Sequence, residues 1–209
     1  YNGLPGADRW AAPAGSDNEV FYQNTRFRAL NSVALEYQLT GNEDYAYGAI
    51  RLMEDFITKK GGWYPSGKPE GRGGFPDTLS TSGRAQAWAG TYDIFVKSQS
   101  MGAESATAIL KGICDLGSSL YNVHAAAGNW VSSEMLALSN VALTFPEFAD
   151  SDAWFDMATQ KREEVFLFSA FPDGSYVEAT GGYNRGAYDN AVSFKETIMQ
   201  QGGNVTAEY

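Results

Sequence analysis

The feature that most constrains the fold is a helical apolar period that recurs along the chain between glycine- and proline-containing breaks. Apolar residues return every three or four positions in six or seven segments of similar length, and no segment has the alternation typical of a β-strand. Short connections favour antiparallel neighbours, so the sequence predicts an all-α fold of antiparallel helical hairpins. The expected helices cover residues 24–40, 42–60, 78–97, 103–121, 130–144, 152–169 and 186–200.

The start of the chain lacks this period. Residues 1–23 are rich in glycine and proline, so we expect an irregular leader that packs on the helices through Trp10, Val20 and Phe21. Residues 24–209 are expected to form one helical domain. Because the chain stops soon after its last helix, we expect this domain to be a segment of a longer polypeptide.

Residues that favour turns mark the boundaries inside the helical domain. Gly41 is expected to end the first helix, and Asn42 is expected to cap the second. Residues 61–77 hold six glycines and three prolines among aromatic and charged residues, which no regular element tolerates. We therefore expect a long surface loop there, either functional or simply connecting.

Composition and charge exclude several kinds of partner and site. The formal net charge is −10, whereas a nucleic-acid-binding protein needs a basic face. No run of about 18 apolar residues is present, so no membrane span is expected. With one cysteine and one histidine, the chain is expected to hold no disulfide, metal centre or cofactor. The aromatic fraction of 14% suits a saccharide cleft, although aromatic residues also fill helical cores.

Two polar residues lie at opposite ends of the segment 129–183. Asn129 precedes a helix that is apolar nearly all round and therefore buried, and Tyr183 follows 54 positions later. This length fits a helix, a turn, a second antiparallel helix and a return loop, so both residues are expected at one mouth of the bundle. From the residues alone, the commoner roles are helix capping for Asn129 and packing for Tyr183.

Three motifs in this part of the chain, taken in order, resemble the helical domain of the heparinase II/III-like polysaccharide lyases and the related alginate lyases. Residues 35–57 and 79–95 resemble two earlier helices of the same family, so the resemblance covers most of residues 25–190. The motifs, all within residues 128–184, are Asn-Trp, Phe-Pro-Glu-Phe and Pro-Asp-Gly-Ser-x-x-Glu-x-x-x-x-Tyr.

The resemblance implies an (α/α) toroid, closed or incomplete, that binds an acidic, uronic-acid-containing polysaccharide and cleaves it by β-elimination. It places Asn129 beside the uronate carboxylate and gives proton transfer to Tyr183. In this family a β-sandwich domain supplies a catalytic histidine; such a domain would lie outside this chain, where His124 is the one histidine. The resemblance also implies a secreted or periplasmic location.

β-Elimination needs residues of these types. The C5 proton of a uronate is weakly acidic because the adjacent carboxylate resists a second negative charge, so a donor such as the Asn129 amide must stabilise the enolate. A base then takes the proton and an acid protonates the leaving O4, and Tyr183 can do both in turn. Arg84 or Arg185 is expected to sit beside the tyrosine or to bind a carboxylate bidentately.

Several candidates stay open between binding and structural roles. Trp88 and Trp130 suit stacking on sugar rings, but their helical spacing suits core packing equally. Glu178 suits either the orientation of a neighbouring donor or simple solvation. His124 suits a base or substrate ligand, and a lone histidine is as often structural.

Two other functions compete with a lyase. A glycoside hydrolase on a similar helical toroid would use a pair of carboxylates from Asp77, Asp93, Asp173 and Glu178. A non-catalytic helical module would keep the cleft and bind a glycan without turnover.

Overall fold

The computed structural model describes residue 10 and residues 18–60 and 77–200. These residues form an all-α structure, which confirms the expected fold class, and their one extended pairing is an isolated antiparallel bridge between Ala170 and Tyr176. The helices are α1 (Asn18–Thr25), α2 (Ala29–Thr40), α3 (Glu43–Lys60), α4 (Thr78–Phe95), α5 (Ala103–Asn122), α6 (Gly128–Thr144), α7 (Ser151–Ser169) and α8 (Gly181–Gln200).

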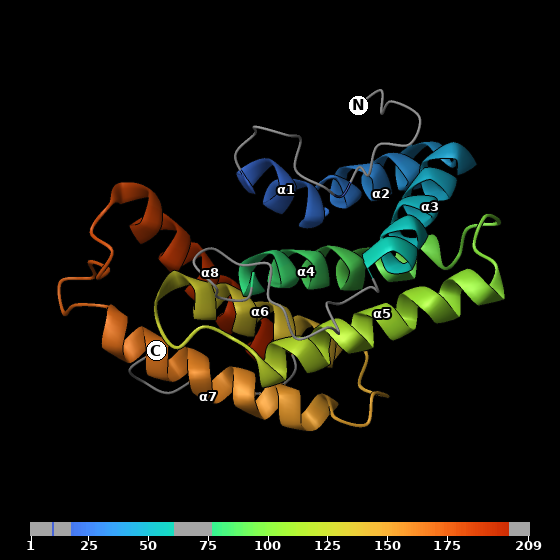
Figure 1. Ribbon diagram of the computed structural model, residues 1–209. Helices are drawn as coiled ribbons and strands as arrows, with labels where there is room; N and C mark the ends of the chain where they lie inside the picture. Colours follow the sequence, from blue (N-terminus) through green and yellow to red (C-terminus); the bar gives the residue numbers. More distant parts are fainter. Residues whose placement is uncertain (1–9, 11–17, 61–76, 201–209) are drawn as a thin grey trace.

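Helix α6 lies at the centre of the arrangement (Figure 1). It packs most extensively against α7 and α4, and it also contacts α5 and α8. Helices α2 and α3 form a pair, with α2 against α4 and α3 against α5. None of the helices in the described part of the chain is both long enough and apolar enough to cross a membrane.

The apolar circumference of α6 explains its central place. Buried apolar side chains lie on opposite faces of this helix: Val131, Met135 and Leu138 are at most 1% exposed, and Leu136 and Ala137 are at most 8% exposed. Burial of one such side chain stabilises the fold by about 1.5–3 kcal/mol, so a helix that is apolar all round gains most when other helices surround it. The expectation that this helix is buried is confirmed.

The expected turn signals between the first helices are also confirmed. Gly41 adopts a left-handed conformation, with φ 65°, and its N–H donates to the Tyr37 carbonyl oxygen. The Asn42 side chain accepts a hydrogen bond of 3.0 Å from the Asp44 N–H at the start of α3. The expected loop at 61–77 lies outside the described residues except for its last residue, Asp77, which caps α4.

The structure differs from expectation at the start of the helical domain. Helix α1 occupies residues that were expected to belong to an irregular leader, and α2 begins at Ala29 instead of continuing from residue 24. The break occurs at Phe27, whose φ of 56° is left-handed and costs a residue with a side chain roughly 1–2 kcal/mol. The apolar period cannot reveal such a break, because Phe27 is buried on either path.

Aromatic packing holds Phe27 in place. Its ring stacks on Trp10 with centroids 5.1 Å apart and meets Phe56 and Trp88 edge-on at 5.3 Å each. The indole N–H of Trp10 donates to an Asp55 carboxylate oxygen at 2.8 Å. Packing of the leader through Trp10 is therefore confirmed, whereas the side chains of Val20 and Phe21 lie outside the described part.

The last helix also begins earlier than expected. Helix α8 starts at Gly181, not at residue 186, so Tyr183 lies in its first turn instead of in a return loop. The segment before it forms the bridge at Ala170 and Tyr176, with the Val177 N–H donating to the Ser169 carbonyl oxygen at 2.8 Å.

Glycines on α5 let large aromatic side chains reach the helix backbone. A Cβ added at Gly117 would lie 2.5 Å from Cζ3 of Trp154, and a Cβ at Gly112 would lie 2.8 Å from Cζ3 of Trp88. Both tryptophans are almost fully buried, so neither can move outward without opening a cavity.

We expect Gly117→Ala to lower the free energy of unfolding by up to about 2 kcal/mol, because overpacking costs about 1–3 kcal/mol and the helix gains about 1 kcal/mol from alanine. Gly90→Ala is the matched control, since Gly90 is an exposed helical glycine with no atom near the added Cβ, and it should stabilise the protein. Urea denaturation measures both. Equal stability of the two variants would contradict this account.

A carboxylate at the start of α3 joins three parts of the chain. Glu43 accepts hydrogen bonds from the Tyr37 hydroxyl at 2.9 Å and from the Ser98 and Ser100 hydroxyls at 2.5 and 2.8 Å. The hydroxyls of Ser98 and Ser100 are the main reason that the pKa of Glu43 is lowered from 4.5 to about 2. This cluster ties α2 and α3 to the connection between α4 and α5.

We expect Glu43→Gln to lower the thermal unfolding midpoint at pH 7. A lowered pKa means that the unfolded state binds the proton first, so the stabilising effect is complete above pH 4.5 and is lost as the pH falls towards about 2. The difference between the two proteins should shrink over this window. Glu36→Gln, at an exposed position on α2, is the control and should follow the wild type throughout. Parallel pH profiles for Glu43→Gln and the wild type would refute the account.

Candidate functional site

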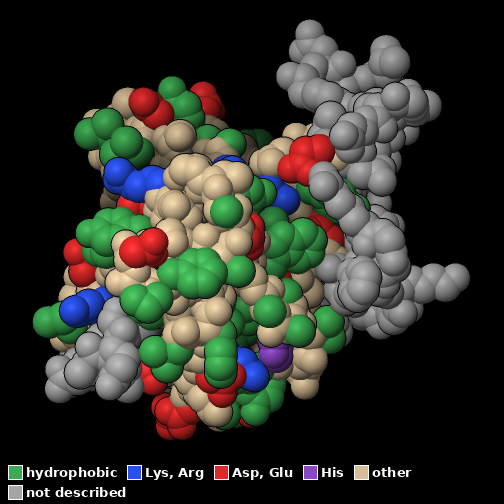
Figure 2. Space-filling view, turned by 90° about the vertical axis from the view of Figure 1, so that its left-hand side faces the viewer, with side chains coloured by type: hydrophobic (Ala, Val, Ile, Leu, Met, Phe, Trp, Pro, Cys, Tyr) green, Lys and Arg blue, Asp and Glu red, His purple; other side chains and the backbone are tan. Residues whose placement is uncertain are grey.

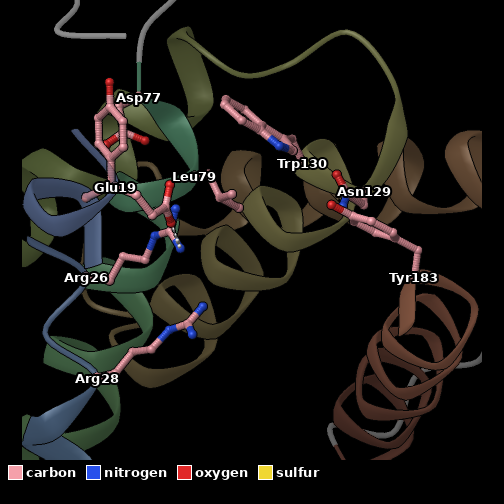
Figure 3. A pocket seen from close by; sticks show the side chains of 9 residues that line it. Glu19, Arg26, Arg28, Asp77, Leu79, Asn129, Trp130 and Tyr183 are labelled. Atoms are coloured by element: carbon pink, nitrogen blue, oxygen red, sulfur yellow. Dashed lines mark ion pairs between the residues drawn. The ribbon is translucent and has the colours of Figure 1, made fainter. Parts of the chain in front are cut away.

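A cavity of about 390 Å³ lies where the first turns of α4, α6 and α8 meet α1 and the α1–α2 turn (Figure 3). This volume is within the roughly 300–1,000 Å³ of typical small-ligand sites. The lining residues come from five separate parts of the chain: Glu19, Tyr22, Arg26, Arg28, Asp77, Leu79, Asn129, Trp130 and Tyr183.

Asn129 and Tyr183 meet at this cavity. Asn129 lies in the first turn of α6, and the Tyr183 ring extends towards it from the first turn of α8 (Figure 3). Tyr183 is 48% exposed, so a ligand in the cavity can reach it. Within the described residues, no group hydrogen-bonds the side-chain amide of Asn129. The structure thus brings together the two residues that the sequence places at the ends of a helical hairpin.

Glu178 fixes the start of α6. Its carboxylate oxygen accepts a hydrogen bond of 2.9 Å from the backbone N–H of Asn129, although Ala127 is the residue at the N-cap position. Gly128 has a φ of 81° and lies so close that an added Cβ would be 3.3 Å from the same oxygen. The capping role considered for Asn129 therefore belongs to Glu178, which leaves the Asn129 side chain facing the cavity.

The two tryptophan candidates separate in the structure. Trp130 lines the cavity, whereas Trp88 is 0% exposed and packs in the aromatic core. Helical spacing alone does not distinguish these positions, because α4 is buried along most of its length.

Arg84 and Arg185 do not line the cavity. Arg84 is buried, with its guanidinium 4.5 Å from the centre of the Phe56 ring and its Nη1 donating to the Thr25 carbonyl oxygen at 2.7 Å. Arg185 is exposed and its Nε donates to Asp189 at 2.7 Å, a contact that raises the pKa of the guanidinium. Arg84 instead fastens the end of α1, and Arg185 forms a surface pair within α8.

His124 also lies outside the cavity lining. Its Nδ1 is 3.1 Å from the Leu120 carbonyl oxygen at the end of α5. The next residue, Ala125, donates its N–H to the Glu134 carboxylate at 2.7 Å. Burial raises the pKa of Glu134, opposed by hydrogen bonds from the Thr78 hydroxyl and the Ala125 N–H. Glu134 thus ties the loop that carries His124 to the middle of α6.

Arg26 and Arg28 are the basic cavity residues that sequence reasoning missed, together with Glu19, Tyr22 and Leu79. Arg26 forms an ion pair with Glu19 at 3.7 Å, and its Nε donates to the Ser80 hydroxyl at 3.4 Å. Arg28 is exposed on the cavity side of the α1–α2 turn. In the sequence, one arginine on each side of Phe27 is the pattern of exposed positions on an ordinary helix. The left-handed backbone at Phe27 places both arginines at one cavity.

The carboxylates suggested for a hydrolase are dispersed. Among them, Asp77 alone is a lining residue; it caps α4 by accepting the Ser80 N–H at 3.0 Å, and burial raises its pKa. Asp173 holds its own turn by accepting from the Ser175 N–H and hydroxyl, which lower its pKa. Asp93 is exposed on α4. The structure therefore assembles no pair from these four residues at the cavity.

Neither metal-ligand clusters among the described residues nor the face shown in Figure 2 indicates another site. In the described segments no group of three histidine, cysteine or acidic side chains could hold a metal ion. On the face shown in Figure 2, acidic side chains are scattered among basic and hydrophobic ones. The net charge of −10 is therefore not concentrated on this face.

The sequence from residue 7 to residue 207 matches the family model of the heparinase II/III N-terminus, and the chain belongs to this family. A heparin-sulfate lyase from Pedobacter heparinus is 26% identical over 181 residues, which cover 86% of this chain and 27% of the relative.

Solved structures share the fold. A heparan sulfate lyase, HepC, from Pedobacter heparinus, solved as a mutant, superposes with a TM-score of 0.78 at 24% identity, covering 96% of this chain and 31% of that one. A crystal structure of heparinase III gives a TM-score of 0.74 at 17% identity, covering 95% and 33%. The chain thus spans about a third of the length of these proteins, and its helices have the arrangement found in part of them.

We expect Glu178→Ala to destabilise the protein by about 1 kcal/mol, because it removes the acceptor for a backbone N–H at a helix start. Amide hydrogen exchange should show the loss locally, as faster exchange at Asn129. Asp77→Ala is the matched control: it removes the corresponding cap of α4 and should speed exchange at Ser80 while leaving Asn129 unchanged. Unaltered exchange at Asn129 in Glu178→Ala would show that this hydrogen bond does not hold α6.

Proposed function

We propose that this chain supplies the substrate-binding helical part of a polysaccharide lyase that cleaves a uronic-acid-containing glycan by β-elimination. The observation that carries the proposal is the meeting of Asn129, Trp130 and Tyr183 at one cavity, although they come from two different helices. Membership of the heparinase II/III N-terminus family and the similarity to a heparin-sulfate lyase support it. The secreted or periplasmic location belongs to the same proposal.

Asn129 binds the uronate carboxylate in this mechanism. Its amide has no partner within the described residues, so it can donate to a ligand without breaking an existing hydrogen bond. Removal of the C5 proton puts a second negative charge beside the carboxylate, and a donor fixed in place stabilises the enolate that forms. The cap from Glu178 holds the Asn129 backbone, which keeps the donor in position.

Tyr183 moves the proton. Its phenolate takes the C5 proton, the electrons of the C–H bond form the C4–C5 double bond, and the C4–O4 bond breaks. The tyrosine then returns a proton to the O4 of the leaving sugar. The products are a chain with an unsaturated uronate at its new end and a second chain with a free hydroxyl, and no water is consumed. Trp130 offers an apolar ring face for an adjacent sugar.

We expect Tyr183→Phe to lower the rate of formation of ultraviolet-absorbing unsaturated products by about 10²–10⁴-fold, the usual contribution of a positioned acid–base group. The substrates are alginate, heparan sulfate, hyaluronan and glucuronan. Tyr188→Phe, on the same helix at an exposed position outside the cavity, is the control and should retain full activity. Full activity of Tyr183→Phe would show that another group transfers the proton.

The same assay separates the competing functions. A hydrolase would shorten the polymer and leave saturated ends, without a change in absorbance. Binding of a polymer in calorimetry without any shortening would indicate a non-catalytic module.

A further inference from the structure

Arg28 faces the catalytic candidates across the cavity. Figure 3 shows Arg26 and Arg28 on one side of the cavity, and Asn129 and Tyr183 on the other. The space between them is therefore bounded by a guanidinium on one side and by the amide and the phenol on the other.

The backbone at Phe27 produces this placement. Its left-handed φ of 56° lets the ring of Phe27 point into the aromatic core while the arginines before and after it both line the cavity. Three hydrogen bonds fasten the end of α1 and the turn to α4. Arg84 donates to the Thr25 carbonyl, the Ser80 hydroxyl donates to the Tyr22 carbonyl at 3.4 Å, and the Arg26 Nε donates to the Ser80 hydroxyl at 3.4 Å. Strained backbone that its surroundings hold in place is a frequent feature of binding sites.

The charges around the cavity single out Arg28. Arg26 is paired with Glu19, and the carboxylates of Asp77 and Glu178 occupy the N-termini of α4 and α6. Arg28 has neither an ion-pair nor a hydrogen-bond partner among the residues that the structure describes. A guanidinium without a counter-ion beside a cavity is suited to bind a carboxylate or a sulfate bidentately.

We propose that Arg28 is a specificity-determining residue that binds a second acidic group of the polysaccharide, on a sugar other than the one whose carboxylate Asn129 holds. The proposal rests on the proposed function for the identity of the ligand. It implies that the cavity recognises polymers with two acidic groups within its span, and that Arg28 contributes to binding instead of to proton transfer.

Three variants test the proposal: Arg28→Ala, Arg28→Lys and, as the matched control, Arg51→Ala at an exposed position on α3 away from the cavity. Calorimetry gives Kd and the absorbance assay gives KM and kcat, on heparan sulfate, on chemically desulfated heparan sulfate and on glucuronan. Arg28→Ala should raise Kd and KM roughly tenfold or more, the usual effect of losing a charge-assisted hydrogen bond, with little change in kcat. The Kd and KM of Arg28→Lys should lie between those of the wild type and those of Arg28→Ala, because lysine keeps the charge and loses the bidentate geometry.

The substrates identify the acidic group. An equal loss on all three polymers assigns a carboxylate to Arg28, and a loss confined to sulfated heparan sulfate assigns a sulfate; either result supports the proposal. Arg28→Ala should also make the Kd less dependent on salt concentration, because the substitution removes an ionic contact. The proposal would be overturned if Arg28→Ala had the same Kd, KM and salt dependence as the wild type on every polymer.

The same measurements distinguish a failure of the role of Arg28 from a failure of the lyase assignment. If the wild type binds these polymers without forming an absorbing product, and Arg28→Ala weakens that binding, the lyase assignment fails and the role of Arg28 stands. If the wild type forms the product and Arg28→Ala behaves like Arg51→Ala, the role of Arg28 fails and the lyase assignment stands. Thermal unfolding of each variant confirms that it is folded.

Discussion

The enclosure of α6 by α4, α5, α7 and α8 is the constraint on which the rest of the structure depends. Because nearly every face of α6 is apolar, the neighbouring helices pack against it from all sides. The positions of these helices determine where their N-termini lie. The N-terminus of α6 then lies beside those of α4 and α8, and these three ends form most of the cavity (Figure 3). The helix also contains the fully buried Glu134. Its carboxylate accepts a hydrogen bond from the Ala125 N–H, which offsets part of the free-energy cost of burying the carboxylate and holds the preceding loop in place.

Helix N-termini favour negative charge, and here the protein supplies much of it from its own side chains. Asp77 occupies the end of α4 and Glu178 the end of α6, so neither helix presents a bare set of N–H groups to the cavity. On the proposed function, recognition of an acidic polymer rests on side chains, namely the Asn129 amide and the arginines of the α1–α2 turn, more than on helix dipoles. Under the same proposal, this balance of charge favours a carboxylated or lightly sulfated substrate over a densely charged one.

Sequence reasoning predicted what depends on periodicity and local turn chemistry. The spacing of seven of the eight described helices, the stop at Gly41 and the cap at Asn42 follow from patterns within a short window. The approach of Asn129 to Tyr183 follows from the summed lengths of the elements between them. The role of Arg26 and Arg28 depends on the left-handed Phe27, which aromatic packing from Trp10, Phe56 and Trp88 makes tolerable, and no local pattern reveals that packing. Arg84 was expected beside Tyr183 or a substrate carboxylate, and Trp88 stayed open between stacking and core packing. A period identifies a face of α4 without showing that most of its faces are buried.

The hydrogen bond from Asn129 to Glu178 joins two parts of the chain that are far apart in sequence. Glu178 precedes Tyr183 by less than two helical turns, so the segment that positions the tyrosine also holds the backbone of the asparagine. The positions of Asn129 and Tyr183 therefore both depend on this segment. If this segment opens, Tyr183 moves and the Asn129 backbone loses its acceptor in the same event, so one local opening affects both residues.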